Sequence, residues 1–389
     1  MLIRQRIVRQ TLLVLYFLLS YDGVQGEIKL SKLEDLELEK QLKLLNKPAV
    51  KTIKTKYGDT YDCVDFYKQP AFDHPLLKNH NFHPKMKATK TVALLELFLL
   101  KELLKMILSD KDIFHPPEGI AFESTLSNIN NNSEPTKSYM SSRGYKLATV
   151  QIPYDPNNKF AGAGMSATLW NPRIESQQHT ACRLKIQKGS DILQAGWRVD
   201  PTLYRDTKTR SFIHFQAGNT HCFNTLCPGF VIVNSKFPVD VSFDTIQQRG
   251  DKKVWEITLF IERDLANGNW WLLYDVNNEQ VGFWRQEIFT KLTSFANNVE
   301  WGGVAYSSPS VSEPPMGSSC FPVGDPAYDA YCRRLNVLND KGETVHIDKT
   351  NVRVTDPNHY GIMDEPHWRG AKYQHMIFYG GPGGFETLC

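Results

Sequence analysis

The sequence lacks a strong excess of either charge and lacks any apolar run long enough to cross a bilayer. Its 389 residues include 45 Lys and Arg against 42 Asp and Glu, a formal net charge of +3. Such a balance gives no single-sign field that would attract nucleic acids or membrane surfaces, so we expect neither as a partner. The 41% hydrophobic content is that of a globular chain. Aromatic residues, at 12% with eight Trp, favour a β-rich body or an aromatic-lined groove.

The N-terminus has the parts of an export signal. Three arginines precede the apolar residues 12–19, and a small residue, Gly26, follows at the expected cleavage point. The apolar stretch is about half of the roughly 20 residues that a membrane-spanning helix needs. We therefore expect residues 1–26 to be a signal peptide, and the mature protein to be secreted, extracellular or in a cell wall, without a membrane anchor.

Residues 27–140 differ in composition from the rest and are expected to form a small α+β segment before the main domain. Residues 28–46 and 91–108 place apolar side chains at helical spacing, which predicts amphipathic helices. Glycine-containing residues 56–59 indicate a hairpin. Residues 128–137 are polar and are typical of a linker.

Three histidines of this segment, His74, His80 and His83, invite a metal-site interpretation. Their spacing spans two prolines and does not place them on one face of a helix. We expect turn or packing roles for them, and no metal or other cofactor.

From about residue 141 the pattern is that of short strands and turns. Residues 254–262 alternate strictly between two faces, and the turn formers Asn267 and Gly268 follow before another apolar run. Residues 339–342 indicate a second hairpin. One apolar stripe, over 288–299, predicts a helix. The chain is therefore expected to be mainly β, with residues 141–389 forming an antiparallel β-sandwich.

Seven cysteines in an exported chain indicate disulfides rather than thiol catalysis. Cys222 and Cys227 are close enough in sequence to close a small loop, which contributes roughly 2 kcal/mol. A nucleophilic Cys222 beside His221 is the alternative, but adjacent residues of an extended chain point apart. We therefore expect a Cys222–Cys227 disulfide.

Several long motifs follow one another from about residue 60 to the C-terminus. In order and spacing they resemble the neprosin family of secreted plant proteins, first its activation domain and then its peptidase domain. The motifs are residues 62–65 (DCVD), 69–80 (QPAFDHPLLKNH), 163–174 (AGMSATLWNPRI), 195–197 (AGW), 206–210 (DTKTR), 222–230 (CFNTLCPGF), 268–272 (GNWWL), 282–284 (GFW), 301–303 (WGG), 315–318 (PMGS) and 378–383 (FYGGPG).

The resemblance implies a zymogen in which the activation domain covers a cleft of the β-sandwich. Two glutamates of the family would cut peptide bonds there, after proline in the best-known member. The chemistry needs two carboxyls that share a proton, one activating water and the other donating a proton. The family places one glutamate before Ala-Gly-Trp and the other after Trp-Gly-Gly. Here those positions are Gln194 and Val304.

These replacements leave two interpretations of the site. Gln194 can donate a hydrogen bond to an oxyanion but cannot titrate, and Val304 can do neither. Glu300 faces the same way as Val304 on a regular strand but lies roughly 13 Å along it, too far to replace a residue at 304 without a bulge. If Glu300 is itself the family's second glutamate, a Gln194/Glu300 dyad is feasible.

Two classes of function follow. One is a glutamic endopeptidase with a modified dyad, and the other is a non-catalytic protein that binds a peptide or a cell-wall polymer in the inherited cleft. In either case the partners expected are a peptide or protein ligand and the chain's own prosegment. Five tryptophans are candidates to line the cleft, with a core role as the alternative: Trp197, Trp270, Trp271, Trp284 and Trp301.

The remaining cysteines depart from the family. His359 stands where the family has a cysteine, which would leave Cys389 without its usual partner. Cys320 and Cys332 both stand where other residues are expected. Their joint appearance predicts a Cys320–Cys332 disulfide.

Overall fold

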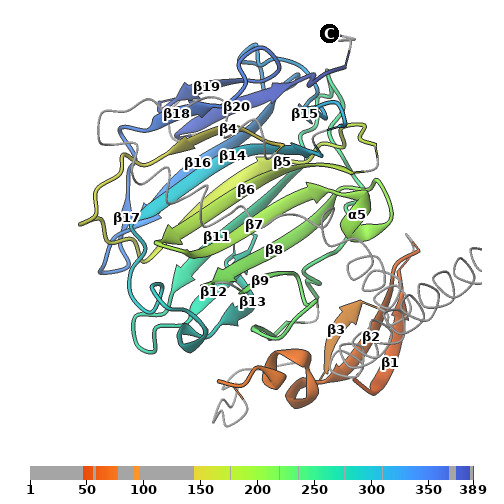
Figure 1. The fold of residues 1–389 in the computed structure, drawn as a ribbon, viewed down its shortest axis with the longest axis vertical. Helices are drawn as coiled ribbons and strands as arrows, with labels where there is room; N and C mark the ends of the chain where they lie inside the picture. Colours follow the sequence, from red (N-terminus) through yellow and green to blue (C-terminus); the bar gives the residue numbers. More distant parts are fainter. Residues whose placement is uncertain are drawn as a thin grey trace, which may run out of the picture.

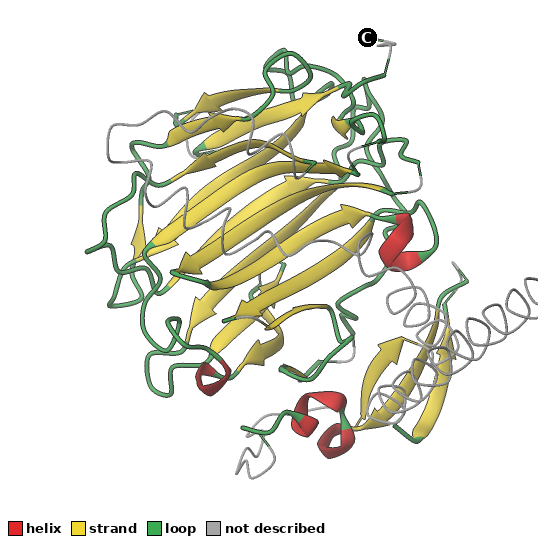
Figure 2. Cartoon of the chain, viewed as in Figure 1, coloured by secondary structure: helices red, strands yellow, loops and turns green. Residues whose placement is uncertain are grey.

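Two antiparallel sheets stack face to face in the computed structural model, with a smaller sheet beside them (Figure 1). The residues that the structure describes are 47–55, 58–77, 91–95, 144–175, 177–218, 220–234, 236–275, 277–308, 310–367, 374–385 and 389. Strands dominate these residues and helices are few and short (Figure 2). The mainly β, sandwich-type fold predicted from the sequence is confirmed.

The larger sheet has ten strands. Eight follow one another in the order β10-β13-β12-β11-β5-β16-β20-β15, while β17 pairs with β16 and β19 pairs with β20. Their bounds are β5 Gly162–Thr168, β10 Phe230–Ile232, β11 Glu256–Arg263, β12 Trp270–Tyr274, β13 Glu279–Trp284, β15 Met316–Gly317, β16 Ala330–Leu338, β17 Thr344–Val345, β19 Gly361–Glu365 and β20 Met376–Gly381.

The second sheet has seven strands in the order β18-β4-β14-β6-β7-β8-β9. Their bounds are β4 Tyr145–Gln151, β6 Gln178–Lys188, β7 Asp191–Val199, β8 Arg210–Ala217, β9 Thr220–Phe223, β14 Asn298–Ser307 and β18 Asn351–Val354. A one-turn helix, α5 (Pro201–Tyr204), follows β7.

The turn chemistry expected from the sequence is present. β11 alternates buried and half-buried residues and pairs with β12 across the turn that contains Gly268, where φ is +78°. β16 pairs with β17 across the turn that contains Gly342, where φ is +79°. Glycine adopts such positive φ values without steric cost.

The helix predicted over 288–299 is wrong. Only a short 3-10 turn, η3 (Gln286–Ile288), forms before β14 begins at Asn298. The Asp191 carboxylate accepts hydrogen bonds from the backbone amides of Thr290, Lys291 and Leu292, so these donors are used outside a helix. The apolar residues of the stripe over 288–299 are apolar because they are buried in the core, not because they form a helix.

Two tryptophans define the inner face of the seven-stranded sheet. Trp197 on β7 and Trp301 on β14 donate from their indole nitrogens to the carbonyl oxygens of Thr168 and Gly164 on the other sheet, at 2.8 and 3.1 Å. Because successive strand residues point to opposite faces, Gln194 and Glu300 lie on the outer face of the same strands.

The small sheet belongs to the N-terminal part of the chain and has the order β1-β2-β3. Its strands are β1 Ala49–Lys54, β2 Thr60–Asp65 and β3 Thr91–Leu95, and the 3-10 turns η1 (Phe66–Lys68) and η2 (Pro70–Asp73) follow β2. The predicted hairpin at 56–59 is confirmed by the β1–β2 pairing. The helix predicted over 91–108 is wrong for 91–95, and its remainder lies outside the described residues.

The signal peptide, the helix over 28–46 and the linker at 128–137 also lie outside the described residues. Within the residues described, the structure contains no helix long and apolar enough to cross a bilayer.

Candidate active site

Gln194 and Glu300 lie in one row across the seven-stranded sheet. Lys185 on β6 is the register partner of Gln194 on β7 and also of Glu300 on β14. The row continues to His214 on β8, the partner of Gln194. With no register shift between these strands, the three side chains at 185, 194 and 300 share the outer face. All are buried, and Glu300 is only 1% exposed.

Arg183 binds both Gln194 and Glu300. Its Nη1 donates to Oε1 of Gln194 at 3.0 Å, and its Nη2 donates to Oε1 of Glu300 at 2.8 Å. Gln194 therefore presents its carbonyl oxygen to Arg183, which leaves its NH₂ group to donate elsewhere. One guanidinium group thus fixes the orientation of both candidate residues.

Positive charge dominates the surroundings of Glu300. Burial by itself raises the pKa of Glu300, but the charges of Lys185, Arg183 and Arg353 outweigh burial and lower the pKa to about 2. Arg353 on β18 approaches Oε2 of Glu300 at 3.7 Å. Glu300 is therefore ionised above about pH 2 and can accept a proton but not readily keep one.

Val304 lies elsewhere on the same face. Its register partner on β6 is Ala181, which pairs in turn with Arg198 rather than with Gln194. Val304 packs in a small buried cluster with Tyr145, Leu147 and Tyr306. The structure therefore brings Glu300, and not residue 304, to Gln194.

Two family models match the chain. The model described as "Neprosin activation peptide" covers residues 52–98, and the model described as "Neprosin" covers residues 176–382, more than half of the chain. The chain belongs to the neprosin family. The two matches fall inside the segments 27–140 and 141–389 expected from the sequence.

Solved structures similar to this neprosin-family chain include two peptidases. One is Scytalido-glutamic peptidase with a peptide-based transition-state analogue, 11% identical, with a TM-score of 0.35 over 61% of this chain and 98% of that one. The other is SCP-B, a member of the Eqolisin family, with a tripeptide, at 11% identity and a TM-score of 0.33 over the same shares. A third similar structure is a pentraxin from Limulus polyphemus, with a TM-score of 0.17 and 13% identity over 42% of this chain and 74% of that one. TM-scores this low do not establish a common fold.

The tryptophans of this neprosin-family chain do not line an open cleft. Trp197, Trp270, Trp284 and Trp301 are fully buried in the hydrophobic core, so the core role given as the alternative is confirmed for them and the cleft-lining role is wrong. Trp271 is partly buried and packs against Phe283, with ring centroids 4.6 Å apart. Large aromatic side chains fill the space between the sheets instead.

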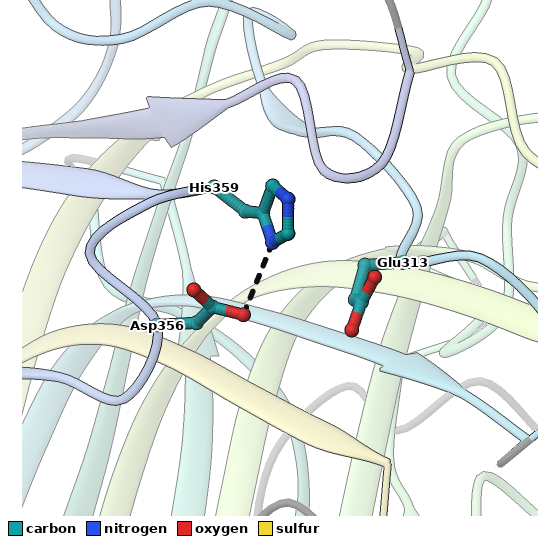
Figure 3. A group of neighbouring side chains, drawn as sticks. All are labelled: Glu313, Asp356 and His359. Atoms are coloured by element: carbon teal, nitrogen blue, oxygen red, sulfur yellow. Dashed lines mark hydrogen bonds and ion pairs between the residues drawn. The ribbon is translucent and has the colours of Figure 1, made fainter.

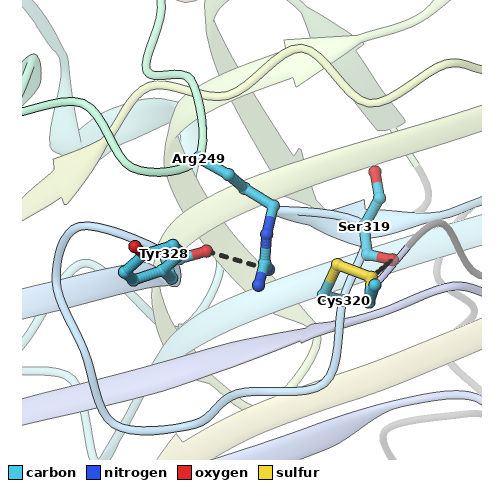
Figure 4. Close-up of a disulfide and its surroundings, with 5 residues drawn as sticks. Arg249, Ser319, Cys320 and Tyr328 are labelled. Atoms are coloured by element: carbon cyan, nitrogen blue, oxygen red, sulfur yellow. Dashed lines mark hydrogen bonds between the residues drawn. A yellow bond between two sulfur atoms is a disulfide. The ribbon is translucent and has the colours of Figure 1, made fainter.

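One of the two predicted disulfides is confirmed and the other is wrong. Cys222 and Cys227 form the predicted disulfide, which leaves no thiol at Cys222 for nucleophilic chemistry. Cys320 is bonded to Cys389 and not to Cys332, so the predicted Cys320–Cys332 disulfide is wrong (Figure 4). The reason is topological: Cys320 follows the short edge strand β15, whereas Cys332 is buried in the middle of the sheet on β16.

A group of potential metal ligands lies at the other end of the sandwich. The ligand atoms of Glu313, Asp356 and His359 all lie within 4.8 Å of one another (Figure 3). Lys146 contacts two of them, with Nζ 2.9 Å from Asp356 and 3.3 Å from Glu313. The ammonium group of Lys146 supplies the positive charge that these carboxylates need. We therefore interpret the cluster as an ion-pair network. Of the histidines weighed as metal ligands in the sequence, His80 and His83 lie outside the described residues, and His74 is not in this group.

The activation segment is held against the edge of the sandwich. Asp59 accepts hydrogen bonds from Arg210 on β8 and from Ser242, both at 2.6 Å. The Gln69 side chain donates to the Ile232 carbonyl at 3.2 Å and accepts from its amide at 2.8 Å, which covers the edge strand β10. The segment's apolar side chains join the main core: Val64, Phe66, Ala71, Phe72 and Leu77.

The site contains residues that the sequence did not single out. Arg183, Lys185, Arg353 and His214 surround Gln194 and Glu300 but belong to three other strands. The alternation of apolar and polar residues over 182–187 marks a strand with a polar outer face. That pattern identifies candidates on β6, but it does not show which strand lies beside it.

Proposed function

We propose that this neprosin-family chain is the zymogen of a peptidase with one catalytic carboxylate, Glu300, assisted by Gln194 and Arg183. The observation that carries the proposal is the shared contact of Gln194 and Glu300 with one buried guanidinium group. It places a base, an amide and a fixed positive charge within reach of one peptide bond.

The proposed reaction uses Glu300 first as a base and then as an acid. Its carboxylate takes a proton from a water molecule whose oxygen attacks the peptide carbonyl carbon. The Gln194 amide and the Arg183 guanidinium stabilise the negative charge that forms on the carbonyl oxygen. Glu300 then gives its proton to the amide nitrogen, the C–N bond breaks, and a carboxylic acid and an amine leave.

The low pKa of Glu300 bears on the expected working range. Protonation removes the base only below its pKa of about 2. The carboxylate therefore stays available as a base at acid pH, where an ordinary glutamate with a pKa near 4.3 would be protonated. Export of the chain through the secretory route, with cleavage after Gly26 and prosegment removal after about residue 140, belongs to the same proposal.

A second candidate function is non-catalytic binding of a peptide or cell-wall polymer. The observation that favours it is the same ion cluster: three cationic side chains, Arg183, Lys185 and Arg353, surround one carboxylate and reduce its basicity. In that case Val304 replaces the family's second glutamate, and the site binds its peptide or polymer ligand without hydrolysing it.

Acid treatment of the purified full chain with a proline-containing peptide separates the two functions. The matched sample is a Gln194→Glu, Val304→Glu double variant, which restores both glutamates of the family motifs. Cleavage by the natural protein, read by mass spectrometry, supports the single-carboxylate peptidase. Cleavage by the double variant alone supports the binding protein and contradicts the peptidase.

A further inference from the structure

Two cysteines outside the two disulfides face each other across the sandwich. Cys182 lies on β6 of the seven-stranded sheet and Cys332 on β16 of the ten-stranded sheet. Their sulfur atoms are 3.0 Å apart, and both residues are 0% exposed. Both belong to strands in the interior of their sheets, and not to edge strands.

We infer that Cys182 and Cys332 form a third disulfide, which ties the two sheets together through the core. The 3.0 Å separation is within about 1 Å of a covalent S–S bond, so closure needs only a small side-chain rotation. Trp197 is the cross-strand neighbour of Cys182. A buried inter-sheet disulfide packed on a tryptophan is an arrangement that other β-sandwiches use.

The redox chemistry requires an external disulfide. The two thiols lose two protons and two electrons as the S–S bond forms, and a dithiol–disulfide oxidant, such as an oxidoreductase of the secretory route or glutathione disulfide, is reduced to two thiols. The other two disulfides already indicate an oxidising compartment. Burial raises the pKa of the Cys332 thiol, so exchange is expected during folding, before the sheets close.

The cross-link would bear on the candidate site through strand β6. Cys182 immediately precedes Arg183, which holds both Gln194 and Glu300. Anchoring Cys182 to the opposite sheet fixes the backbone from which Arg183 projects. We therefore expect the bond to support the geometry of the site as well as the stability of the sandwich.

Thiol counting on the full chain tests the inference. The protein, recovered from an exporting host, is denatured and alkylated before any reduction. Of the seven cysteines, the two disulfides that the structure contains leave Cys63, Cys182 and Cys332. A third disulfide predicts one alkylated thiol, at Cys63, and a Cys63→Ser control with none. A non-reduced peptide map should contain the Cys182 peptide linked to the Cys332 peptide.

Two results would overturn the inference: alkylation of Cys182 and Cys332 in the natural protein, or a map that links either one to another cysteine. The melting temperature of a Cys182→Ala, Cys332→Ala variant is a second test. It should fall by about 5–15 °C, because such a long loop is no longer closed. An unchanged melting temperature would also count against the bond, whereas the peptide map stays informative if the variant fails to fold.

Discussion

Gln194 and Glu300 accept hydrogen bonds from the two terminal nitrogens of the same arginine, Arg183, in the interior of the seven-stranded sheet. They are separated by 106 positions in sequence and by one strand, β6, in space. The contact joins the two residues into one polar unit that also includes the guanidinium of Arg183.

Removal of the Arg183 guanidinium should destabilise the fold. In Arg183→Met, Glu300 stays buried without the guanidinium that donates to its Oε1, and breaking one side of a buried ion pair costs about 3–5 kcal/mol. Denaturant unfolding measures the loss. Arg183→Lys is the control: it keeps the charge but not the forked geometry, and it should lose less. Equal stability of Arg183→Met and the natural protein would show that the contact is not energetically important.

The stability of the fold should fall as the pH drops from about 5 to 2. Glu300 has a pKa lowered from 4.5 to about 2. A lowered pKa contributes stability that is present above the unfolded value and lost as the pH falls through the folded value. The contribution is about 3 kcal/mol. The free energy of unfolding of Glu300→Gln should therefore change less than that of the natural protein between pH 6 and pH 2. Parallel profiles would contradict the assignment.

Loss of the Asp59 carboxylate should loosen the activation segment at neutral pH. Burial raises the pKa of Asp59, but the hydrogen bonds from Arg210 and Ser242 lower it by more, so its contribution is fully present above about pH 3.8 and is lost as the pH falls from there through the lowered pKa. Hydrogen exchange of the β2 amides in Asp59→Asn should be about tenfold faster or more at pH 7, since hydrogen bonds to a charged group contribute about 1.5–3 kcal/mol.

The same comparison at low pH provides the control. As the pH falls below 3.8 and through the lowered pKa of Asp59, its carboxylate becomes protonated, so the difference in exchange rate between the natural protein and Asp59→Asn should shrink. Asp62→Asn, on the same strand but bonded to the exposed Thr52 of the neighbouring strand, should show little difference at either pH. A pH-independent difference for Asp59→Asn would mean that its charge is not what holds the segment.

Val304→Glu should not replace Glu300. Position 304 lies in a cluster of apolar and aromatic side chains, and an ionised carboxylate placed there is expected to cost stability. In a Glu300→Gln, Val304→Glu double variant we expect no more peptide hydrolysis than in Glu300→Gln alone. Recovery of activity in the double variant would show that residue 304 reaches Gln194 after all.

Much of the fold could be predicted from local patterns. The alternation over 254–262 and the glycine turns at Gly268 and Gly342 identify strands and hairpins, because these signals depend on neighbouring residues only. The stripe over 288–299 misleads, because burial in a core gives apolar residues whether or not a helix forms. What decided that segment was a carboxylate about 100 residues away, Asp191, which binds its amides.

The candidate site could be predicted only in part for the same reason. Gln194 and Glu300 stand out through motifs, but their closeness depends on strand order and register, which local patterns do not specify. The strand β6 lies between them, and its Arg183 has no motif. The pairing of Cys320 likewise depends on where the C-terminal Cys389 comes to lie, and not on spacing along the chain.

The most direct test of the account is the hydrolysis of a proline-containing peptide at acid pH by the natural protein and by Glu300→Gln, which keeps the size of the side chain but removes its base. Val304→Ala serves as the control, since it lies on the same strand outside the row. The account predicts at least a 100-fold loss of kcat/KM for Glu300→Gln, with Val304→Ala close to the natural protein. Equal cleavage by Glu300→Gln and the natural protein would contradict the central claim.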